Sequence, residues 1–290
     1  MHSFSFLTLL LAALALGLAG SPQSVAQSVA QGLPPISIYF NKSVDTALAY
    51  PPGNVAIGDA DLGAIAVQEI AKATYSVDMA MYNLNLQSVA DALIAAKNRG
   101  VKVRAICHVE NISGAKFQQL ILAGIPLIAN PTALSGQIQP LMHNKFLAID
   151  ARPGAIAQPR PVAIMGSWNA TFGQTYEDPN NLVIFRDSAI ADAYLKEFEE
   201  MWGSNEDTPN EATAKFGEAK ADNTPHTFTV GGVGVTVFFS PSDRTASQIN
   251  GALRTGENAI YTANLTFTYS QFASTLSRQK KSGADVRCIV

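Results

Sequence analysis

The sequence is poor in several residue types, and each shortage argues against a class of protein. Only two cysteines, Cys107 and Cys288, occur in 290 residues, too few for a disulfide framework. Both lie in β-like runs, so we expect buried free thiols, with a single disulfide bridge as the alternative. With four histidines and no H-E-x-x-H or C-x-x-C spacing, the sequence predicts no metal ion and no cofactor.

Charge is also scarce. Charged residues make up 15% of the chain and the net charge is −3, so the basic excess of a non-specific DNA-binding protein is missing. A local basic cleft can exist on an acidic protein, so nucleic acid stays open as a less favoured partner. The 47% of apolar residues is typical of a globular chain with one large or two modest domains.

One long apolar run is present, from Phe4 to Ala19, and it is short for a membrane span of about 20 residues. It is followed by Ser24-Val25-Ala26, a small-x-small cleavage site. The pattern predicts a signal peptide over residues 1–26, a secreted or periplasmic location, and a mature chain without a transmembrane segment. An uncleaved anchor is the alternative, because the first residues contain no Lys or Arg.

Hydrophobic periodicity predicts alternating strands and helices from residue 35 to residue 203. This alternation indicates an α/β domain with a mixed β-sheet covered by helices. Strands are expected at 36–40, 75–82, 101–107, 125–128, 145–150, 162–165 and 182–185, and helices at 61–73, 86–99, 116–123 and 188–202.

The composition changes after residue 203. Residues 204–230 are polar and contain few large apolar side chains, which predicts an interdomain linker. Beyond it the pattern restarts, which predicts that residues 231–290 are the start of a second, incomplete copy of the domain. Two unrelated α/β segments are the alternative. Three blocks match in order: 37–43 with 236–242, 75–84 with 258–267, and 93–104 with 276–287.

The segment from His143 to Asp150 has the spacing H-x-K-x4-D. On a strand, His143 and Lys145 face the same way, so an imidazole and an ammonium group point into one cleft. Ser167 and Asn169, in the later G-S-W-N segment, also share a face and could hydrogen-bond phosphate oxygens. These residues form an anion-binding set that contains one nucleophile or acid–base group.

The H-x-K-x4-D motif followed by G-S-x-N resembles the phospholipase D superfamily. The resemblance implies a phospholipase D-like sandwich fold and a reaction without a metal. It implies that His143 is the nucleophile that forms a phosphohistidine, that Lys145 neutralises the phosphate, and that Ser167 and Asn169 bind it. Asp150 would support the site from behind without contacting the substrate.

The chain departs from the family pattern in two ways. A Glu-Asn pair often follows G-S-x-N, whereas this chain has Asn180-Asn181. The family site also combines two H-x-K-x4-D motifs, and this chain has one. The repeat would place a second histidine at roughly position 326, so we expect either a missing C-terminal half or a homodimer to complete the site.

The leading hypothesis is a secreted phosphodiesterase that cleaves a phospholipid. A metal-independent nuclease acting as a homodimer and an inactive phosphate-binding fragment are the alternatives. An HNH-type metal nuclease is disfavoured, because further histidines near His143 are missing. His108 and Glu110 are expected to be solvated loop residues, with a place in the lining of the cleft as the alternative. Trp168 and Trp202 are expected to be packing residues, and contact of Trp168 with the substrate is the alternative. Lys280 and Lys281 are expected at a solvated helix end.

Overall fold

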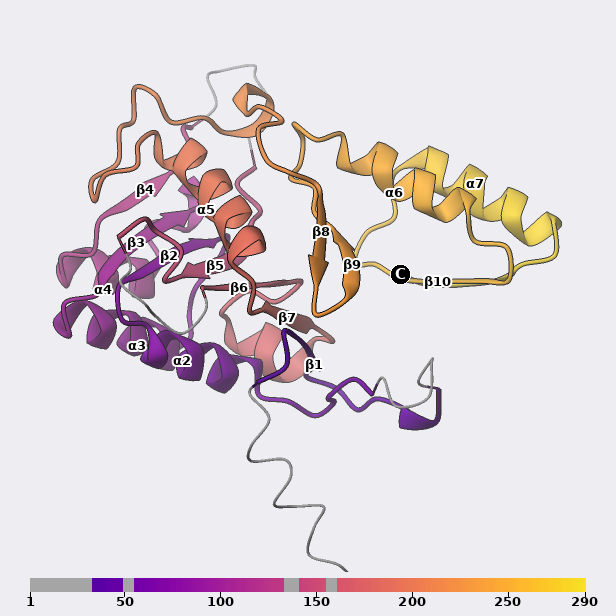
Figure 1. Ribbon diagram of the computed structural model, residues 1–290, viewed down its shortest axis with the longest axis horizontal. Coiled ribbons are helices and arrows are strands. Elements are labelled where there is room, and N and C mark those ends of the chain that lie inside the picture. Colours follow the sequence, from indigo (N-terminus) through magenta and orange to yellow (C-terminus); the bar gives the residue numbers. More distant parts are fainter. Residues whose placement is uncertain (1–32, 49–54, 133–140, 155–160) are drawn as a thin grey trace, which may run out of the picture. The chain divides into compact units, whose positions relative to one another are not determined.

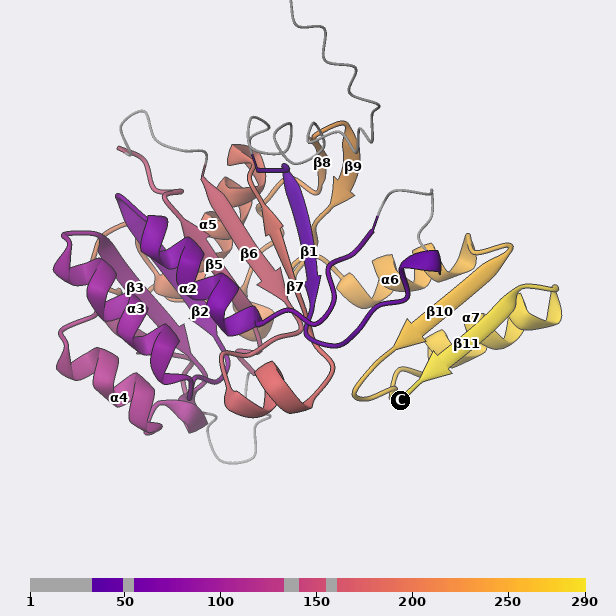
Figure 2. The same ribbon diagram turned by 90° about the horizontal axis from the view of Figure 1, so that it is seen from below.

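A mixed β-sheet between two layers of helices carries the H-x-K strand (Figures 1 and 2). The computed structural model describes residues 33–48, 55–132, 141–154 and 161–290, so the predicted signal peptide lies outside the described residues. The strands of the sheet are β1 (Ile36–Phe40), β2 (Ser76–Met81), β3 (Lys102–Cys107), β4 (Leu127–Ala129), β5 (Lys145–Ile149), β6 (Val162–Gly166) and β7 (Asn181–Phe185). The helices are α2 (Leu62–Lys72), α3 (Gln87–Asn98), α4 (Ala115–Leu122) and α5 (Ser188–Trp202), with short turns η1 (Thr46–Leu48), η2 (Val109–Asn111) and the π-helical η3 (Gly173–Glu177).

Among the described residues, the sheet has seven strands in the order β1-β7-β6-β5-β2-β3-β4. Strands β2, β3 and β4 run parallel, and the crossovers between them contain α3 and α4, as parallel pairing requires. Strands β5, β6, β7 and β1 pair antiparallel. Strand β5 therefore lies inside the sheet, between β2 and β6.

Both faces of β5 are buried. Leu147 and Ile149 pack into the core formed with α2, α3 and α4, whereas Phe146 and Ala148 pack into the core formed with α5. A strand buried on both faces reads as a continuous apolar run, which explains the sequence between Lys145 and Asp150. The apolar run fixes the position of the polar residues at its ends.

Helix α5 has clear start and stop signals. The Asp187 side chain accepts hydrogen bonds from the backbone N–H groups of Ala189 and Ile190, which satisfies two free donors of the first turn. Gly203 ends the helix at φ 78°, and a Cβ atom there would lie 2.1 Å from the Asn210 carbonyl oxygen. Only glycine fits this left-handed position without moving the chain.

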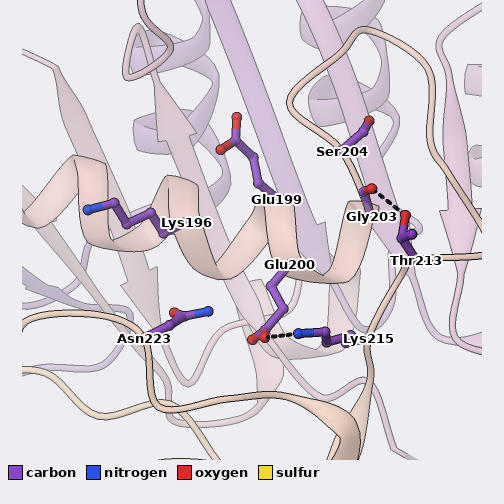
Figure 3. Close-up of a pocket in the computed structure, with 8 residues that line it drawn as sticks. All are labelled: Lys196, Glu199, Glu200, Gly203, Ser204, Thr213, Lys215 and Asn223. Carbon is purple, nitrogen blue, oxygen red and sulfur yellow. Dashed lines mark hydrogen bonds and ion pairs between the residues drawn. The ribbon is translucent and has the colours of Figure 1, made fainter.

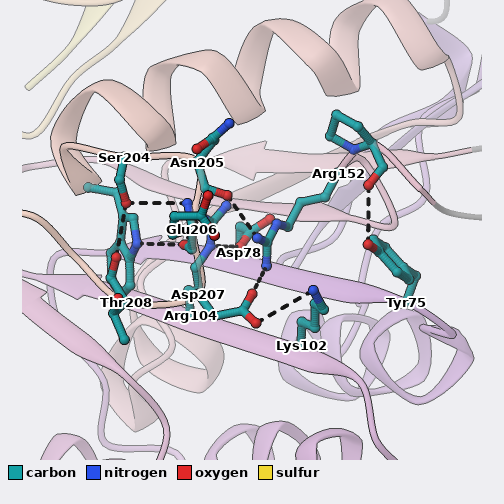
Figure 4. A network of polar contacts seen from close by, with 12 residues as sticks. Tyr75, Asp78, Lys102, Arg104, Arg152, Ser204, Asn205, Glu206, Asp207 and Thr208 are labelled. Atoms are coloured by element: carbon teal, nitrogen blue, oxygen red, sulfur yellow. Dashed lines mark hydrogen bonds and ion pairs between the residues drawn. The ribbon is translucent and has the colours of Figure 1, made fainter.

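A buried ion pair connects the sheet to the segment after α5 (Figure 4). Arg104 on β3 donates to Asp78 on β2 at 2.6 Å, and both side chains are fully buried. Burial raises the Asp78 pKa, and the Arg104 charge opposes that rise. Arg104 also donates to the Glu206 carbonyl oxygen, and Arg152 pairs with Asp207. The first residues of the predicted linker are tied to the sheet by these contacts.

The residues after 226 contain a hairpin and a smaller parallel pair of strands. The elements are β8 (Thr227–Val230), β9 (Val233–Thr236), α6 (Thr245–Arg254), β10 (Ala259–Ala263), α7 (Ser270–Lys281) and β11 (Asp285–Ile289), with the turn η4 (Gly217–Ala219) before them. Ala259 pairs with Asp285 and Ser76 pairs with Lys102, so the paired residues are 26 positions apart in both parallel units. This common register agrees with the predicted internal repeat.

Most predicted elements are confirmed within two residues at each end, and α5 agrees at both ends. The β8–β9 hairpin was not predicted, and residues 237–239 are not a strand. Cys107 is buried as expected, whereas the prediction for Cys288 is wrong, because β11 leaves that residue exposed. Trp168 and Trp202 are buried, and Lys280 and Lys281 are exposed, as expected.

Asp150 joins the end of β5 to the start of β2. Its backbone has φ 51°, and its buried carboxylate accepts hydrogen bonds from the backbone N–H groups of Thr74, Tyr75 and Ser76 and from the Thr74 hydroxyl. Its own N–H donates to the Ser76 carbonyl oxygen. These contacts set the register of β5 against β2.

Replacing this carboxylate is expected to destabilise the fold. Asp150→Asn keeps the side-chain shape and tolerates the left-handed backbone, but it places an NH2 group against backbone donors. We expect a loss of about 2–3 kcal/mol in the free energy of unfolding, measured by urea denaturation. Asp192→Asn, which removes a half-exposed carboxylate on α5, is the control and should cost under about 1 kcal/mol. Equal losses in the two variants would contradict this role for Asp150.

Candidate functional site

His143 and Lys145 lie at the start of β5. His143 is exposed in the chain just before the strand, and the Lys145 ammonium donates to the His143 carbonyl oxygen at 2.9 Å. Lys145 is the first residue of β5 and lies at the end of the sheet, where it pairs with Met81 on β2. The two predicted residues therefore lie together, at the end of the sheet where β2 and β6 end and β5 begins.

Tyr82, directly after β2, contacts both residues of the pair. Its ring lies edge-on to the His143 ring at 4.8 Å between centroids, and the Lys145 ammonium lies 5.4 Å from the ring centroid. The Tyr82 N–H donates to the Asn144 carbonyl oxygen, and Asn111 donates to the Tyr82 carbonyl oxygen. Backbone hydrogen bonds on two sides thus hold the aromatic ring beside the pair.

The site favours a neutral imidazole beside a cation at neutral pH. Burial lowers the pKa of His143 below 6.5, and the charges of Lys145 and His108 lower it further. Burial also lowers the pKa of Lys145, to about 8. At pH 7 His143 is therefore mostly unprotonated and Lys145 mostly protonated, as nucleophilic attack on a phosphodiester requires.

Ser167 and Asn169 follow β6 at the same edge of the sheet. The Ser167 hydroxyl donates to Asn180 Oδ1 and accepts from the Asn181 N–H. The buried Asn169 amide donates to Gln174 Oε1, and its oxygen accepts from the Asn83 N–H. Both predicted phosphate-binding residues therefore have hydrogen-bond partners within the protein. Gln174, which orients Asn169, lies in η3, an element that the sequence did not predict.

Gly166 closes the gap between β6 and β7. A Cβ atom at this position would lie 2.2 Å from the Asn181 carbonyl oxygen, so only glycine allows the two strands to approach here. Lys145 and Gly166 line one narrow crevice together with Trp168. This crevice brings the two sequence motifs into contact.

The structure separates Asp150 from the other predicted residues. Asp150 lies at the opposite end of β5, about 16 Å along the strand from Lys145 at roughly 3.3 Å per residue. Its hydrogen bonds go to the chain that enters β2 and not to His143. The predicted support of the site by Asp150 would therefore act through the position of the strand.

His108 was placed wrongly by the sequence interpretation. It is fully buried, stacked on the Tyr82 ring at 5.1 Å between centroids, whereas its neighbour Glu110 is exposed as expected. The sequence offered little signal, because His108 follows an apolar strand at a point where loops usually begin. The hydrogen-bond partner of the His108 ring is Asn130, which directly follows β4 and lies 22 positions later in the sequence.

A larger hollow lies elsewhere, between α5 and the segment that follows it (Figure 3). It has a volume of about 470 Å³, and Figure 3 shows Glu199 and Glu200 directed to different sides of α5. None of the predicted site residues lines it. The lining residues are Lys196, Glu199, Glu200, Gly203, Ser204, Thr213, Lys215 and Asn223.

Comparison with known protein families shows which proteins this part of the chain resembles. Residues 66–202 match the family model described as the PLD-like domain of cardiolipin synthase, and the match includes both motifs. Over these residues the chain is similar to the phospholipase D superfamily. A phospholipase D from Rickettsia prowazekii is 30% identical over 145 residues, which cover 50% of this chain and 62% of the relative. The mitochondrial cardiolipin hydrolase of Drosophila melanogaster is 30% identical over 152 residues, which cover 47% of this chain and 56% of the relative.

A solved structure supports the fold. Polyphosphate kinase from Porphyromonas gingivalis aligns with a TM-score of 0.53 at 11% identity, covering 87% of this chain and 37% of the kinase. The predicted α/β fold with a mixed sheet covered by helices is confirmed. The chain spans less than two thirds of the curated relatives named above. Over the described ranges, no helix is long and apolar enough to cross a membrane.

The lowered lysine pKa can be measured directly. We expect the Lys145 ammonium to lose its proton near pH 8, because its burial beside Tyr82 disfavours the charged form. Reductive ¹³C-dimethylation followed by NMR titration gives a separate signal for each lysine. The signal missing from Lys145→Arg identifies the residue. A Lys145 midpoint at the ordinary lysine value of about 10.4 would contradict the proposed burial effect.

Proposed function

We propose that this chain is a metal-independent phosphodiesterase of the phospholipase D type whose substrate is a phospholipid. The main support is the pairing of an exposed His143, held neutral at pH 7, with a protonated Lys145 at one end of β5. A histidine nucleophile with an adjacent cation supplies both the attacking group and the charge stabilisation that phosphodiester cleavage requires.

The reaction has two steps. A ring nitrogen of His143 attacks phosphorus, a P–N bond forms, and the P–O bond to the leaving group breaks while that oxygen takes up a proton. Water then attacks the phosphohistidine, which breaks the P–N bond and releases the phosphate monoester. Lys145 stabilises the charge on the phosphoryl oxygens in both steps. The proton donor belongs to the second half-site, which we propose is supplied by a homodimer partner or a C-terminal half.

An exposed aromatic pair beside the site favours a lipid over DNA. Phe172 and Tyr176 are both exposed and contact each other at 5.0 Å between ring centroids. Between them in η3 lies Gln174, which binds Asn169. Aromatic side chains of this kind partition into the interface of a lipid bilayer. The chain is similar to proteins named as a phospholipase D and a cardiolipin hydrolase, and this similarity also favours a lipid substrate.

We further propose that the mature protein is exported after removal of residues 1–26, on the basis of the apolar run and the Ser24-Val25-Ala26 site. Expression of the full chain with its own N-terminus, followed by N-terminal sequencing of the extracellular or periplasmic product, tests this. A product that begins at Gln27 is expected. A full-length, membrane-bound product would show an uncleaved anchor instead.

The decisive test is His143→Ala. Loss of the nucleophile is expected to reduce the hydrolysis rate by roughly 10³-fold or more, with EDTA present throughout. Phosphatidylcholine and cardiolipin vesicles and plasmid DNA are the substrates, and peptide mass spectrometry should find an acid-labile phosphoryl group on His143. The control His226→Gln should keep activity. Activity in His143→Ala would contradict the mechanism, and cleavage of DNA alone would contradict the lipid assignment.

Activity should depend on pH in a bell-shaped manner. The rate rises as His143 loses its proton below pH 6.5 and falls as Lys145 loses its proton near pH 8. Initial rates on a soluble diester from about pH 5 to 10 check both limbs. Lys145→Arg should move the alkaline limb to higher pH, because the guanidinium stays protonated. An alkaline limb that Lys145→Arg leaves in place would assign that limb to another group.

The aromatic pair is tested by Phe172→Ser. Burial of a Phe side chain in a bilayer is worth about 1.5–3 kcal/mol, so vesicle hydrolysis should fall by roughly 10-fold or more. Hydrolysis of a soluble diester should stay unchanged. Leu122→Ser, which removes an exposed apolar side chain from the end of α4, is the matched control. A similar fall on both substrates would indicate damage to the site and not loss of lipid binding.

A further inference from the structure

We propose that a buried ion pair, Glu197 with Lys220, positions the nucleophile of this site through Asn144; this rests on the proposed function. Glu197 lies on α5, and Lys220 directly follows η4. The Lys220 ammonium donates to Glu197 Oε1 at 2.5 Å, and the Asn144 amide donates to the same oxygen at 3.3 Å. One carboxylate oxygen therefore joins a buried cation to the residue between His143 and Lys145.

The nucleophile stands on chain that the strand itself does not hold. His143 and Asn144 both precede Lys145, the first residue of β5. The Asn144 carbonyl oxygen accepts the Tyr82 N–H at 3.0 Å, which fixes the backbone at one point. The contact of the Asn144 side chain with α5 supplies a second point. Two fixed points on one residue set the direction in which its neighbour His143 projects.

The side chains on either side of His143 point to α5. Met142 and Phe146 are buried in the core that α5 forms, and Asn144 reaches Glu197 on that helix. Because side chains alternate along an extended chain, His143 is directed away from α5 and toward the site. A turn of the Asn144 side chain away from Glu197 would change the direction of the imidazole.

The charge of Lys220 keeps this carboxylate available as an acceptor. Burial raises the pKa of Glu197, and the charge of Lys220 opposes that rise. An ionised carboxylate only accepts hydrogen bonds, so the NH2 group of Asn144 must face it. Removing Lys220 alone would leave a buried, uncompensated charge and destabilise the fold. The two members of the pair are therefore best replaced together.

A second ion pair on α5 provides a matched control (Figure 3). Glu200 accepts from the Lys215 ammonium at 3.5 Å and from the Ala221 N–H at 3.0 Å, so it ties the same segment to the same helix. Its side chain is 4% exposed, close to the 2% of Glu197. None of its hydrogen bonds within the described chain goes to the H-x-K segment. Glu200→Gln thus tests anchoring of the segment without touching Asn144.

Two double variants separate the hydrogen bond from the ion pair. Glu197→Gln/Lys220→Met and Glu197→Leu/Lys220→Met both remove the two buried charges together, a replacement that proteins often tolerate. Only the Gln variant keeps an oxygen that can accept from the Asn144 amide. We expect kcat on a soluble diester to fall roughly 10-fold or more in the Leu variant and to stay within about threefold of wild type in the Gln variant. KM should change little, because Lys145 is held by the strand.

Asn144→Ala tests the same contact from its other side. It removes a half-buried side chain, so it does not depend on the folding of the double variants. Its kcat should fall as in the Leu variant. Combining Asn144→Ala with Glu197→Leu/Lys220→Met should cost no more than either change alone, because both remove one contact.

Backbone ¹⁵N relaxation measures the positioning without an activity assay. The order parameter of the His143 amide should be that of a rigid backbone in the wild-type chain, in the Gln variant and in Glu200→Gln. It should fall in Asn144→Ala and in the Leu variant. If His143→Ala kept full activity, the proposed function would fail, whereas these order parameters would still confirm or contradict the positioning of residue 143.

Three results would overturn the proposal. The first is an equal kcat in the Gln and Leu double variants, both verified as folded by circular dichroism. The second is Asn144→Ala with the wild-type kcat and the wild-type His143 order parameter. The third is a fall in kcat in Glu200→Gln as large as that in the Leu variant, which would assign the effect to anchoring of the segment after α5.

Discussion

The position of β5 is the constraint on which this structure depends. The strand is buried on both faces and paired on both edges, so it cannot shift along its axis without moving an apolar side chain out of a core. Asp150 fixes one end through backbone hydrogen bonds to the start of β2. The other end then presents Lys145 and His143 at a defined place. The aspartate of the motif thus sets a strand register, and it does so a whole strand away from Lys145 and His143.

The same logic explains why the residues around the site come from distant parts of the sequence. Met81, Lys145 and Gly166 are neighbours across the sheet because their strands end in one row. Glycine at 166 and the hydrogen bonds of Asn169 with η3 bring the second motif against the first. The buried Asp78–Arg104 pair ties the segment after α5 to the face of the sheet that α5 covers. Polar groups at both ends of the apolar strands thus determine which loops can approach the site.

Much of this arrangement could be predicted from the sequence, because the period of apolar residues is a local signal. The strand at Lys145–Ile149 and the helix at Ser188–Trp202 were both recognised from their patterns. The motifs predicted the pairing of His143 with Lys145. What could not be predicted depends on contacts between distant segments: the burial of His108 against Tyr82 and Asn130, and the capture of Asn169 by Gln174. The β8–β9 hairpin was missed because the polar residues before it led to a linker prediction that ran through residue 230, although Phe228, Val230 and Val235 alternate around Gly231-Gly232.

His143 is exposed and adds nothing to either hydrophobic core. Under the proposed mechanism, selection on catalysis would act on this position far more strongly than selection on folding. A descendant that lost the histidine would keep its sheet, its helices and most of its sequence identity. A substitution that removes catalysis would therefore change the folding stability of such an architecture little. Similarity to the superfamily does not by itself show that a protein is active. Under the proposed mechanism, the identity of residue 143 would carry that information.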